Sequence, residues 1–226
     1  RSRGLGDVYK RQVQRMEVAY GRISQSKILE SVLHSDAERI KESIEMIDPN
    51  AFDMAVETIL NAKRIYIVGI RSCAPLAGFL AFYLNMMFDD VRLLSTNSSS
   101  ELFEQIMDIE AGDVMIAISF PRYSKRVINA VTFAKGAGAR VVALTDTAEA
   151  PIAADADHVL VAQSDMASFA DSMVAPMSII NALLVAISRA KEADVNDRLH
   201  RLEEIWDHYD VYDKSPESTA EGDIKV

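Results

Sequence analysis

Short apolar runs rich in β-branched residues alternate with longer amphipathic stretches through the middle of this 226-residue chain. The run at 64–69 ends in glycine, as a buried parallel strand does before a tight turn, and four similar runs follow it. This spacing requires connections that cross the sheet, which gives parallel strands covered by helices on both faces. The sequence therefore predicts an α/β fold, a three-layer α-β-α sandwich around a five-stranded parallel sheet, with strands at 64–69, 91–95, 113–119, 140–145 and 158–162.

The stretches between and after these strands have the apolar spacing of helices. Helices are expected at about 74–88, 99–109 and 125–137, with a shorter one near 150–154. An apolar helix at 169–190 and a more polar one at 194–208 follow the last strand. The apolar helix either packs in the core or lies between two subunits, and its face consists of Phe169, Met173, Met177, Ile180, Leu184 and Ile187.

A helical pattern also precedes the first strand. Ile40, Ile44 and Ile47 recur at helical spacing after a candidate cap at Ser35 or Asp36. The pair Asp48-Pro49 should end that helix, and Asn50 is then expected to cap the next one. These helices lead into the α/β domain.

The first dozen residues differ from the rest, because they have no apolar periodicity and mix glycine with charge. We interpret them as an artefactual string or a disordered terminus, and we expect the natural protein to begin further upstream. The predicted organisation is a terminal segment at 1–12, linker helices at 13–62, the α/β domain at 63–192, a C-terminal helix at 193–210 and a disordered tail at 211–226.

Composition limits the classes of partner. The chain has 24 basic and 34 acidic residues, a net charge of −10. Nucleic-acid affinity comes mainly from Lys and Arg that neutralise phosphates, so these residues are not expected to bind DNA. No apolar stretch reaches the roughly 20 residues that a membrane span needs. The single cysteine, Cys73, cannot form an internal disulfide, which favours a cytoplasmic location.

The ligand crevice of an open parallel sheet lies beyond the carboxyl ends of its strands. The four loops there, in chain order 69–74, 95–101, 119–125 and 145–150, are rich in hydroxyl groups, which suit a phosphate when they lie at helix N-termini. Arg71 or Arg122 could add a bidentate clamp. The same residue types are also ordinary helix caps, so that alternative stays open. The candidates are Arg71, Ser72, Ser95, Thr96, Asn97, Ser98, Ser99, Ser100, Ser119, Arg122, Tyr123, Ser124, Thr145, Asp146 and Thr147.

Other kinds of site have weaker support. The first loop carries one glycine, Gly69, where a dinucleotide fingerprint needs three, and no cofactor is expected. None of the four histidines, His34, His158, His200 and His208, falls in a ligand loop, so no metal site is predicted. Cys73 is favoured as a buried filler over a nucleophile. Glu101 is the one carboxylate worth testing as a base, although a charge in the first turn of a helix explains it as well.

Two segments, AKRIYIVGIRSCAPLAGFLAFYLN and DVMIAISFPRYSKRVINAVTFAKGAGARVVALTDTAEAPIAADADHVLVA, carry a family resemblance. They resemble the SIS (sugar isomerase) domain of RpiR/MurR-type bacterial transcriptional regulators, over about residues 40–190. Within them, IVGIRS and ISFPRYSK are typical of the regulator branch. The enzyme branch has Ser-x-Ser-Gly-x-Thr in the third loop. Here Ser119 and Ser124 keep the outer hydroxyls, while Pro121 and Arg122 replace the inner serine and the flexible glycine.

This resemblance implies a flavodoxin-like SIS domain that senses a phosphorylated sugar or amino sugar. It makes Ser72, Ser119 and Ser124 the main phosphate contacts, beside the candidates Arg71, Arg122, Ser98 and Glu101. It also implies a homodimer or tetramer that contacts DNA only through a helix-turn-helix domain preceding this segment. Two alternatives remain: a sugar-phosphate isomerase that uses Glu101, and a stand-alone binding or scaffolding protein that starts near Val13.

Overall fold

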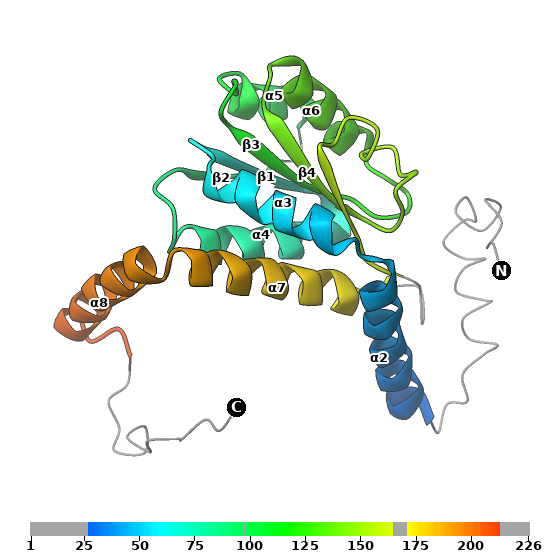
Figure 1. The fold of residues 1–226 in the computed structure, drawn as a ribbon, viewed down its shortest axis with the longest axis horizontal. Helices are drawn as coiled ribbons and strands as arrows, with labels where there is room; N and C mark the ends of the chain where they lie inside the picture. Colours follow the sequence, from blue (N-terminus) through cyan, green and yellow to red (C-terminus); the bar gives the residue numbers. More distant parts are fainter. Residues whose placement is uncertain (1–26, 97, 165–170, 213–226) are drawn as a thin grey trace.

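A five-stranded parallel sheet lies between two layers of helices in the computed structural model, which describes residues 27–96, 98–164 and 171–212 (Figure 1). The predicted fold class is confirmed, and all five predicted strands are present. The strands are β1 (Ile65–Gly69), β2 (Val91–Leu94), β3 (Val114–Ile118), β4 (Arg140–Thr145) and β5 (His158–Val161). The helices are α2 (Ile28–Met46), α3 (Pro49–Leu60), α4 (Ala74–Leu84), α5 (Ser99–Ile106), α6 (Lys125–Gly136), α7 (Val174–Ala190) and α8 (Glu192–His208), with a short 3-10 helix, η3 (Arg71–Cys73).

The strand order β2-β1-β3-β4-β5 reverses the direction of winding at β1. Strand β2 is added on one side of β1, and β3, β4 and β5 follow on the other. Helices α3, α4 and α7 cover one face of the sheet, whereas α5 and α6 cover the other (Figure 1). The connections after β1 and β3 therefore leave the sheet toward opposite faces, and a crevice forms at their carboxyl ends.

Burial on both faces explains why the central strands β1 and β3 are continuous apolar runs. All five residues of β1 are buried. Ile65 and Ile67 pack with α3, α4 and α7, while Tyr66 and Val68 pack with α5 and α6. Successive side chains of a strand point to opposite faces, so a sheet covered on both sides needs apolar residues at every position.

The caps of the two N-terminal helices differ from those expected. The Asp48 side chain accepts a hydrogen bond from the Asn50 N–H at 2.9 Å, so Asp48, and not Asn50, caps α3. The reason is that Pro49, whose fixed φ suits the first turn, already lies inside the helix. The candidate caps Ser35 and Asp36 are also wrong, because α2 runs through both of them.

The predicted helix near 150–154 is also wrong. Residues 151–155 form successive turns, closed by hydrogen bonds from Ala153 N to Ala150 O at 2.8 Å and from Ala156 N to Ala153 O at 3.2 Å. A segment this short gains too few bonds to offset the cost of helix nucleation. The 211–226 tail is described only at Val211 and Tyr212, and the 1–12 segment lies outside the described residues.

Helix α7 belongs to the core. Its predicted apolar face is buried against α3, α4 and the sheet at Met173, Met177, Ile180, Leu184 and Ile187, which favours the core interpretation over a subunit contact. Phe169 lies outside the described residues. Within the described part of the chain, no single helix is long and apolar enough to span a membrane. Helices α7 and α8 together have the length and composition of a span, but the chain bends by 97° between them (Figure 1).

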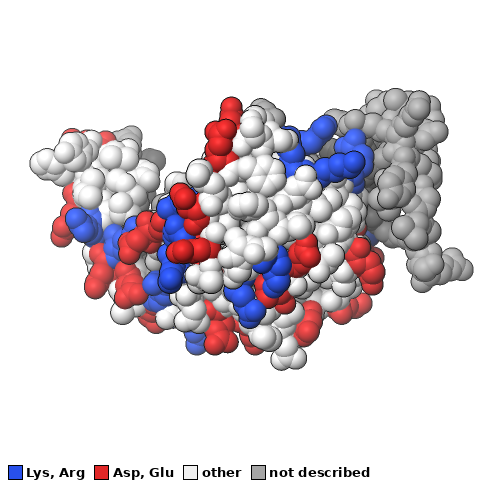
Figure 2. All heavy atoms as spheres, turned by 90° about the horizontal axis from the view of Figure 1, so that it is seen from above, with Lys and Arg blue, Asp and Glu red and all other residues white. Residues whose placement is uncertain are grey.

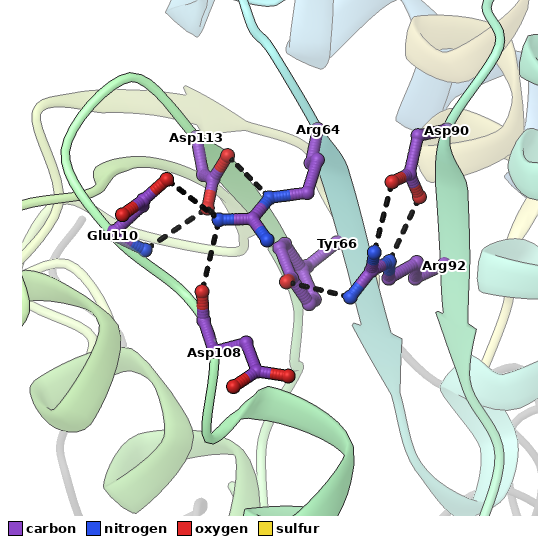
Figure 3. Close-up of polar contacts among 7 residues, drawn as sticks. All are labelled: Arg64, Tyr66, Asp90, Arg92, Asp108, Glu110 and Asp113. Carbon is purple, nitrogen blue, oxygen red and sulfur yellow. Dashed lines mark hydrogen bonds and ion pairs between the residues drawn. The ribbon is translucent and has the colours of Figure 1, made fainter.

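An ionic cluster holds the amino ends of β1 and β3 together (Figure 3). The Arg64 guanidinium donates to both Asp113 oxygens, from Nε at 2.9 Å and from Nη2 at 2.7 Å, and it also donates to the Asp108 carbonyl at 2.9 Å. The Asp113 side chain is fully buried and also accepts the Glu110 N–H at 2.9 Å. The bond to Asp113 is the main cause that raises the pKa of Arg64. Bidentate, charge-assisted bonds of this kind fix geometry as well as adding energy.

A second arginine extends this cluster to β2. Arg92 donates to the two Asp90 oxygens at 2.8 Å and 2.9 Å, and to the Tyr66 hydroxyl at 3.1 Å (Figure 3). Burial raises the pKa of the Tyr66 phenol, and the nearby Arg92 charge only partly opposes this shift. The ion pairs of Arg64 and Arg92 therefore lie at the amino edge of the sheet, away from the crevice.

Gly69 ends β1 directly against the first turn of α4. A Cβ at this position would lie 2.6 Å from the Cys73 carbonyl oxygen and 2.9 Å from the Ala77 Cβ. We expect Gly69→Ala to lower the free energy of unfolding by about 1–3 kcal/mol, because the helix must shift. Gly78→Ala is the matched control, since nothing lies within 4 Å of its added Cβ, and it should raise stability by about 0.5–1 kcal/mol. Urea unfolding measures both, and equal effects would contradict this account.

His158 joins β5 to α3. Its Nε2 lies 2.9 Å from the Thr58 hydroxyl, and only 6% of the residue is exposed. Burial lowers the pKa of His158, and the Arg140 charge acts in the same direction. The folded state therefore favours the neutral ring. Its contribution to stability is present above the unfolded pKa of about 6.5 and is lost as the pH falls through the lower folded value.

We expect the melting temperature to fall between pH 7 and pH 5, and His158→Gln to reduce that fall. Glutamine keeps a polar partner for Thr58 but does not titrate. His200→Gln is the matched control, because the His200 side chain is 78% exposed and should leave the pH dependence unchanged. Melting curves across this range test the prediction, which is wrong if His158→Gln shows the same loss as the unmodified chain.

Candidate functional site

A hollow of about 550 Å³ lies at the carboxyl ends of β1 and β2. Its wall includes Arg71, Ser98 and Glu101, three of the predicted ligand residues. The structure therefore brings the first and second loops together around one cavity. The rest of its lining consists of Gly69, Ile70, Ala74, Leu93, Leu94, Ser95 and Thr96.

The second loop satisfies most of its own polar groups. The Thr96 hydroxyl donates to the Glu101 carboxylate and accepts the Ser98 N–H at 3.0 Å. The Ser98 hydroxyl accepts the Glu101 N–H at 3.5 Å and lies 2.8 Å from the Ser100 hydroxyl. Helix α5 is thus capped from within, and an acidic residue already occupies its first turn. These groups suit sugar hydroxyls better than a phosphate. Asn97 lies outside the described residues.

The N-terminus of α6, which follows the third loop, has no side-chain cap, unlike that of α5. Ser124 occupies the cap position, yet its side chain makes no capping hydrogen bond. The first turn holds Lys125 and Arg126 and no acidic residue. The N–H groups of this turn and the positive end of the helix dipole are therefore left for an anion.

Ser119 is placed less favourably than the sequence suggested. It directly follows β3, its N–H donates to the Leu144 carbonyl at 3.1 Å, and only 3% of the residue is exposed. Ser72, in contrast, is exposed on η3. Of the three predicted phosphate contacts, Ser72 and Ser124 are accessible, whereas Ser119 is nearly buried.

Two arginines at this edge have a backbone conformation that glycine normally adopts. The φ angle is +62° at Arg71 and +66° at Arg122. Such values are uncommon for residues with a side chain and cluster at functional loops. Arg122 stands where the enzyme pattern has its glycine, and its backbone is left-handed although it carries a side chain. No sequence signal pointed to this conformation, because arginine rarely adopts it.

Contacts between loops join the whole carboxyl edge. The Arg126 guanidinium donates to the Thr96 carbonyl at 3.4 Å, which links the third loop to the second. The Tyr123 hydroxyl donates to the Asp146 carboxylate at 2.8 Å, which links the third loop to the fourth. The four predicted loops therefore form one connected surface.

Cys73 lies beneath that surface. It is buried, as the filler interpretation predicts, and burial raises the pKa of its thiol. Hydrogen bonds to the Phe120 backbone and the Ser72 side chain oppose that shift and show that the first loop contacts the third. A buried thiol with a raised pKa holds little thiolate and is poorly suited to nucleophilic attack.

Acid–base and metal chemistry have few candidates at this edge. Among the described lining residues of the hollow, Glu101 is the one carboxylate, and no histidine is present. His158 lies at the amino end of β5, on the opposite edge. Within the described parts of the chain, no group of three or more His, Cys, Asp or Glu residues could hold a metal ion.

The charged side chains form no continuous basic strip on the face shown in Figure 2, which looks down on the layer of α5 and α6. Basic and acidic residues are interspersed there around a largely uncharged centre. Nucleic-acid binding depends on a track of positive charge along the phosphates. This face therefore does not suggest a nucleic-acid interface.

Residues 58–186 match the SIS domain family. An uncharacterized HTH-type transcriptional regulator from Caldanaerobacter subterraneus subsp. tengcongensis is 23% identical over 184 residues, which cover 79% of this chain and 64% of that protein. The HTH-type transcriptional regulator HexR from Escherichia coli is 26% identical over 187 residues, or 79% of this chain and 61% of HexR. The chain thus spans less than two thirds of the length of either relative.

Solved structures share the fold. The sugar isomerase domain of an RpiR transcription factor from Sphaerobacter thermophilus has a TM-score of 0.75 at 28% identity, covering 79% of this chain and 99% of that one. The Vibrio vulnificus NanR protein complexed with ManNAc-6P has a TM-score of 0.70 at 19% identity, covering 87% and 75%. Phosphoheptose isomerase GmhA from Neisseria gonorrhoeae has a TM-score of 0.62 at 21% identity, covering 73% and 99%. The last two likenesses concern the fold alone.

Proposed function

The chain belongs to the SIS domain family, and on that premise we propose that it is the sugar-phosphate-sensing effector domain of a DNA-binding transcriptional regulator. The names of its relatives support the regulator branch, and the RpiR sugar isomerase domain covers most of the chain at 28% identity. The ManNAc-6P complex of NanR supports a phosphorylated sugar or amino sugar as the effector. DNA would be contacted by a separate helix-turn-helix domain and not by these residues.

The observation that carries the proposal is the uncapped N-terminus of α6. Its first turn is basic, its cap residue Ser124 makes no capping bond, and Arg122 precedes it in the same loop. A phosphate bound there would accept the free N–H groups and the Ser124 hydroxyl. Arg122 and Ser72 would approach it from the third and first loops.

The sugar would then extend toward the hollow between the first and second loops. Ser98, Glu101 and Arg71 line that hollow. Carboxylate and hydroxyl oxygens are suitable partners for sugar hydroxyls. The self-capped N-terminus of α5, with its acidic first turn, supports this orientation, because it would repel the phosphate and leave the basic N-terminus of α6 as the preferred position.

We further propose that the domain binds its ligand without converting it. Isomerisation of a sugar moves a proton between neighbouring carbons and needs both a base and an acid in reach. Glu101 is the one carboxylate in the described lining, and the Thr96 hydroxyl already donates to it. The fold likeness to GmhA keeps a sugar-phosphate isomerase as the second candidate. We also propose a cytoplasmic homodimer or tetramer, the usual assembly for a regulator that reads paired half-sites.

A thermal-shift series with glucose 6-phosphate, fructose 6-phosphate, N-acetylmannosamine 6-phosphate and inorganic phosphate tests the proposed site. We expect at least one phosphosugar to stabilise the chain, by about 2.7 kcal/mol at a hundredfold excess over its Kd. Ser124→Ala should weaken binding roughly fivefold, since it removes a hydrogen bond worth about 1 kcal/mol. Ser119→Ala should have a smaller effect, because that residue is nearly buried.

Ser188→Ala is the matched control, because within the described residues this serine bonds to the Val185 carbonyl of its own helix, at 3.0 Å. It should leave every Kd unchanged. Equal affinities for the unmodified chain, Ser124→Ala and Ser188→Ala would place the phosphate elsewhere. A response to inorganic phosphate as strong as the response to every phosphosugar would refute recognition of the sugar.

Conversion is tested by following the same phosphosugars with the chain by NMR. We expect no interconversion of aldose and ketose phosphates beyond the rate without protein. Turnover that disappears in Glu101→Gln would instead establish the isomerase alternative, with Glu101 as its base.

A further inference from the structure

The hollow at the carboxyl ends of β1 and β2 contains two opposite charges that do not pair with each other. Arg71 and Glu101 both line it. The Glu101 carboxylate accepts the Thr96 hydroxyl, whereas the Arg71 side chain makes no hydrogen bond or ion pair with any described residue. Arg71 is also the one cationic side chain in the described lining. A guanidinium stays charged and presents its donors as a planar fork, so this side chain is available to an anion in the hollow.

The backbone around Arg71 is fixed by the short turn η3. The Ile70 carbonyl accepts the Cys73 N–H at 3.3 Å, and the Arg71 carbonyl accepts the Ala74 N–H. Within this turn, Arg71 has a φ angle of +62°, a conformation that costs free energy for a residue with a side chain. The turn therefore holds the arginine at the wall of the hollow before any ligand arrives.

The hollow adjoins the N-terminus of α6. Arg126, in the first turn of that helix, donates to the carbonyl of Thr96 at 3.4 Å, and Thr96 lines the hollow. Arg122 precedes this turn in the third loop, and its side chain likewise has no partner within residues 27–96, 98–164 and 171–212. Two arginines on different loops are therefore available at this edge. A phosphate held at α6 with Arg122 leaves Arg71 for a second anionic group of the same ligand.

The surroundings of Arg71 favour a carboxylate over a second phosphate as that group. Arg71 and Glu101 together give the described lining no net charge, and Ile70, Leu93 and Leu94 form an apolar part of the wall. A carboxylate adds one negative charge and matches the guanidinium fork with two parallel hydrogen bonds. A phosphate adds nearly two charges beside Glu101, where partial exclusion of water strengthens the repulsion.

We propose that the effector is a phosphorylated sugar acid, whose carboxylate pairs with Arg71 in the hollow while its phosphate binds at the N-terminus of α6. The inference rests on the proposed function, since it assumes that the phosphate binds at α6. Glu101 then accepts hydroxyl groups of the carbon chain, for which a carboxylate has several acceptor sites. A neutral sugar phosphate leaves Arg71 without a partner and binds more weakly, which makes Arg71 the residue that determines specificity.

A matched pair of open-chain compounds isolates the carboxylate. The two compounds, 6-phosphogluconate and glucitol 6-phosphate, share a carbon chain and a phosphate, and they differ in having a carboxylate or a hydroxymethyl group at the other end. We expect calorimetry on the complete 226-residue chain to give a Kd roughly tenfold lower for 6-phosphogluconate, because the carboxylate forms charge-assisted hydrogen bonds. Fructose 1,6-bisphosphate, which carries a second phosphate, should bind more weakly than 6-phosphogluconate.

Three arginine variants assign the preference to one side chain. Arg71→Gln should raise the Kd for 6-phosphogluconate roughly tenfold and leave that for glucitol 6-phosphate unchanged, which also shows that the variant is folded. Arg122→Gln should raise both Kd values by the same factor, because both compounds carry the phosphate. Arg189→Gln is the matched control for the loss of one positive charge, since Arg189 is exposed in the last turn of α7, outside the lining of the hollow, and it should change neither Kd.

The outcomes separate this inference from the proposed function. Equal affinity of the unmodified chain for 6-phosphogluconate and glucitol 6-phosphate overturns the sugar acid but leaves a phosphosugar site intact. The same holds if Arg71→Gln weakens both compounds equally, because Arg71 then contacts the phosphate, or if fructose 1,6-bisphosphate binds at least as tightly as 6-phosphogluconate. Absence of binding by every phosphorylated compound removes the proposed function and the inference with it. A preference for 6-phosphogluconate that disappears in Arg71→Gln and persists in Arg189→Gln supports the inference.

Discussion

The parallel direction of all five strands is the constraint on which the rest of the structure depends. Because every strand runs the same way, the two edges of the sheet differ in kind. The amino edge contains the buried Arg64–Asp113 pair, and the carboxyl edge contains the loops that lead into helices. Reversal of the winding at β1 opens the crevice between the loops after β1 and β3. Ion pairs therefore gather at one edge, while hydroxyl-rich loops that bond mainly to one another lie at the other.

The sequence was sufficient for the fold class because burial on both faces of a sheet leaves a strong signal. Each strand is an apolar run too short for a helix, and each was placed within one or two residues of its observed bounds. Local signals were less reliable where two of them competed. Asn50 is a good cap residue, yet Pro49 takes the first helical position, which makes Asp48 the cap. Residues 150–154 have helical composition but form turns, because so short a segment cannot offset the cost of helix nucleation.

The candidate site was predicted at the level of loops and less well at the level of side chains. Which strand ends face the crevice follows from topology, so Arg71, Ser98 and Glu101 meet around one hollow as expected. Exposure does not follow from topology, and Ser119 proved nearly buried because it continues the ladder with β4. The left-handed backbone at Arg122 was likewise not indicated by the sequence. It places a cation, in left-handed backbone, at the position where the enzyme pattern has glycine.

The same polarity of the sheet gives the two N-terminal helices different roles. Helix α3 runs back along the sheet and is fixed at the amino edge, where Thr58 pairs with the buried His158. Helix α2 is fixed at the carboxyl edge, through Asp36 and Ser43. Between them lies an extended residue, Ile47, followed by the cap of α3 at Asp48, so the chain there is not continuous helix. Helix α2 is therefore attached at the edge of the sheet that carries the ligand-loop residues, whereas α3 and the ion pairs lie at the amino edge.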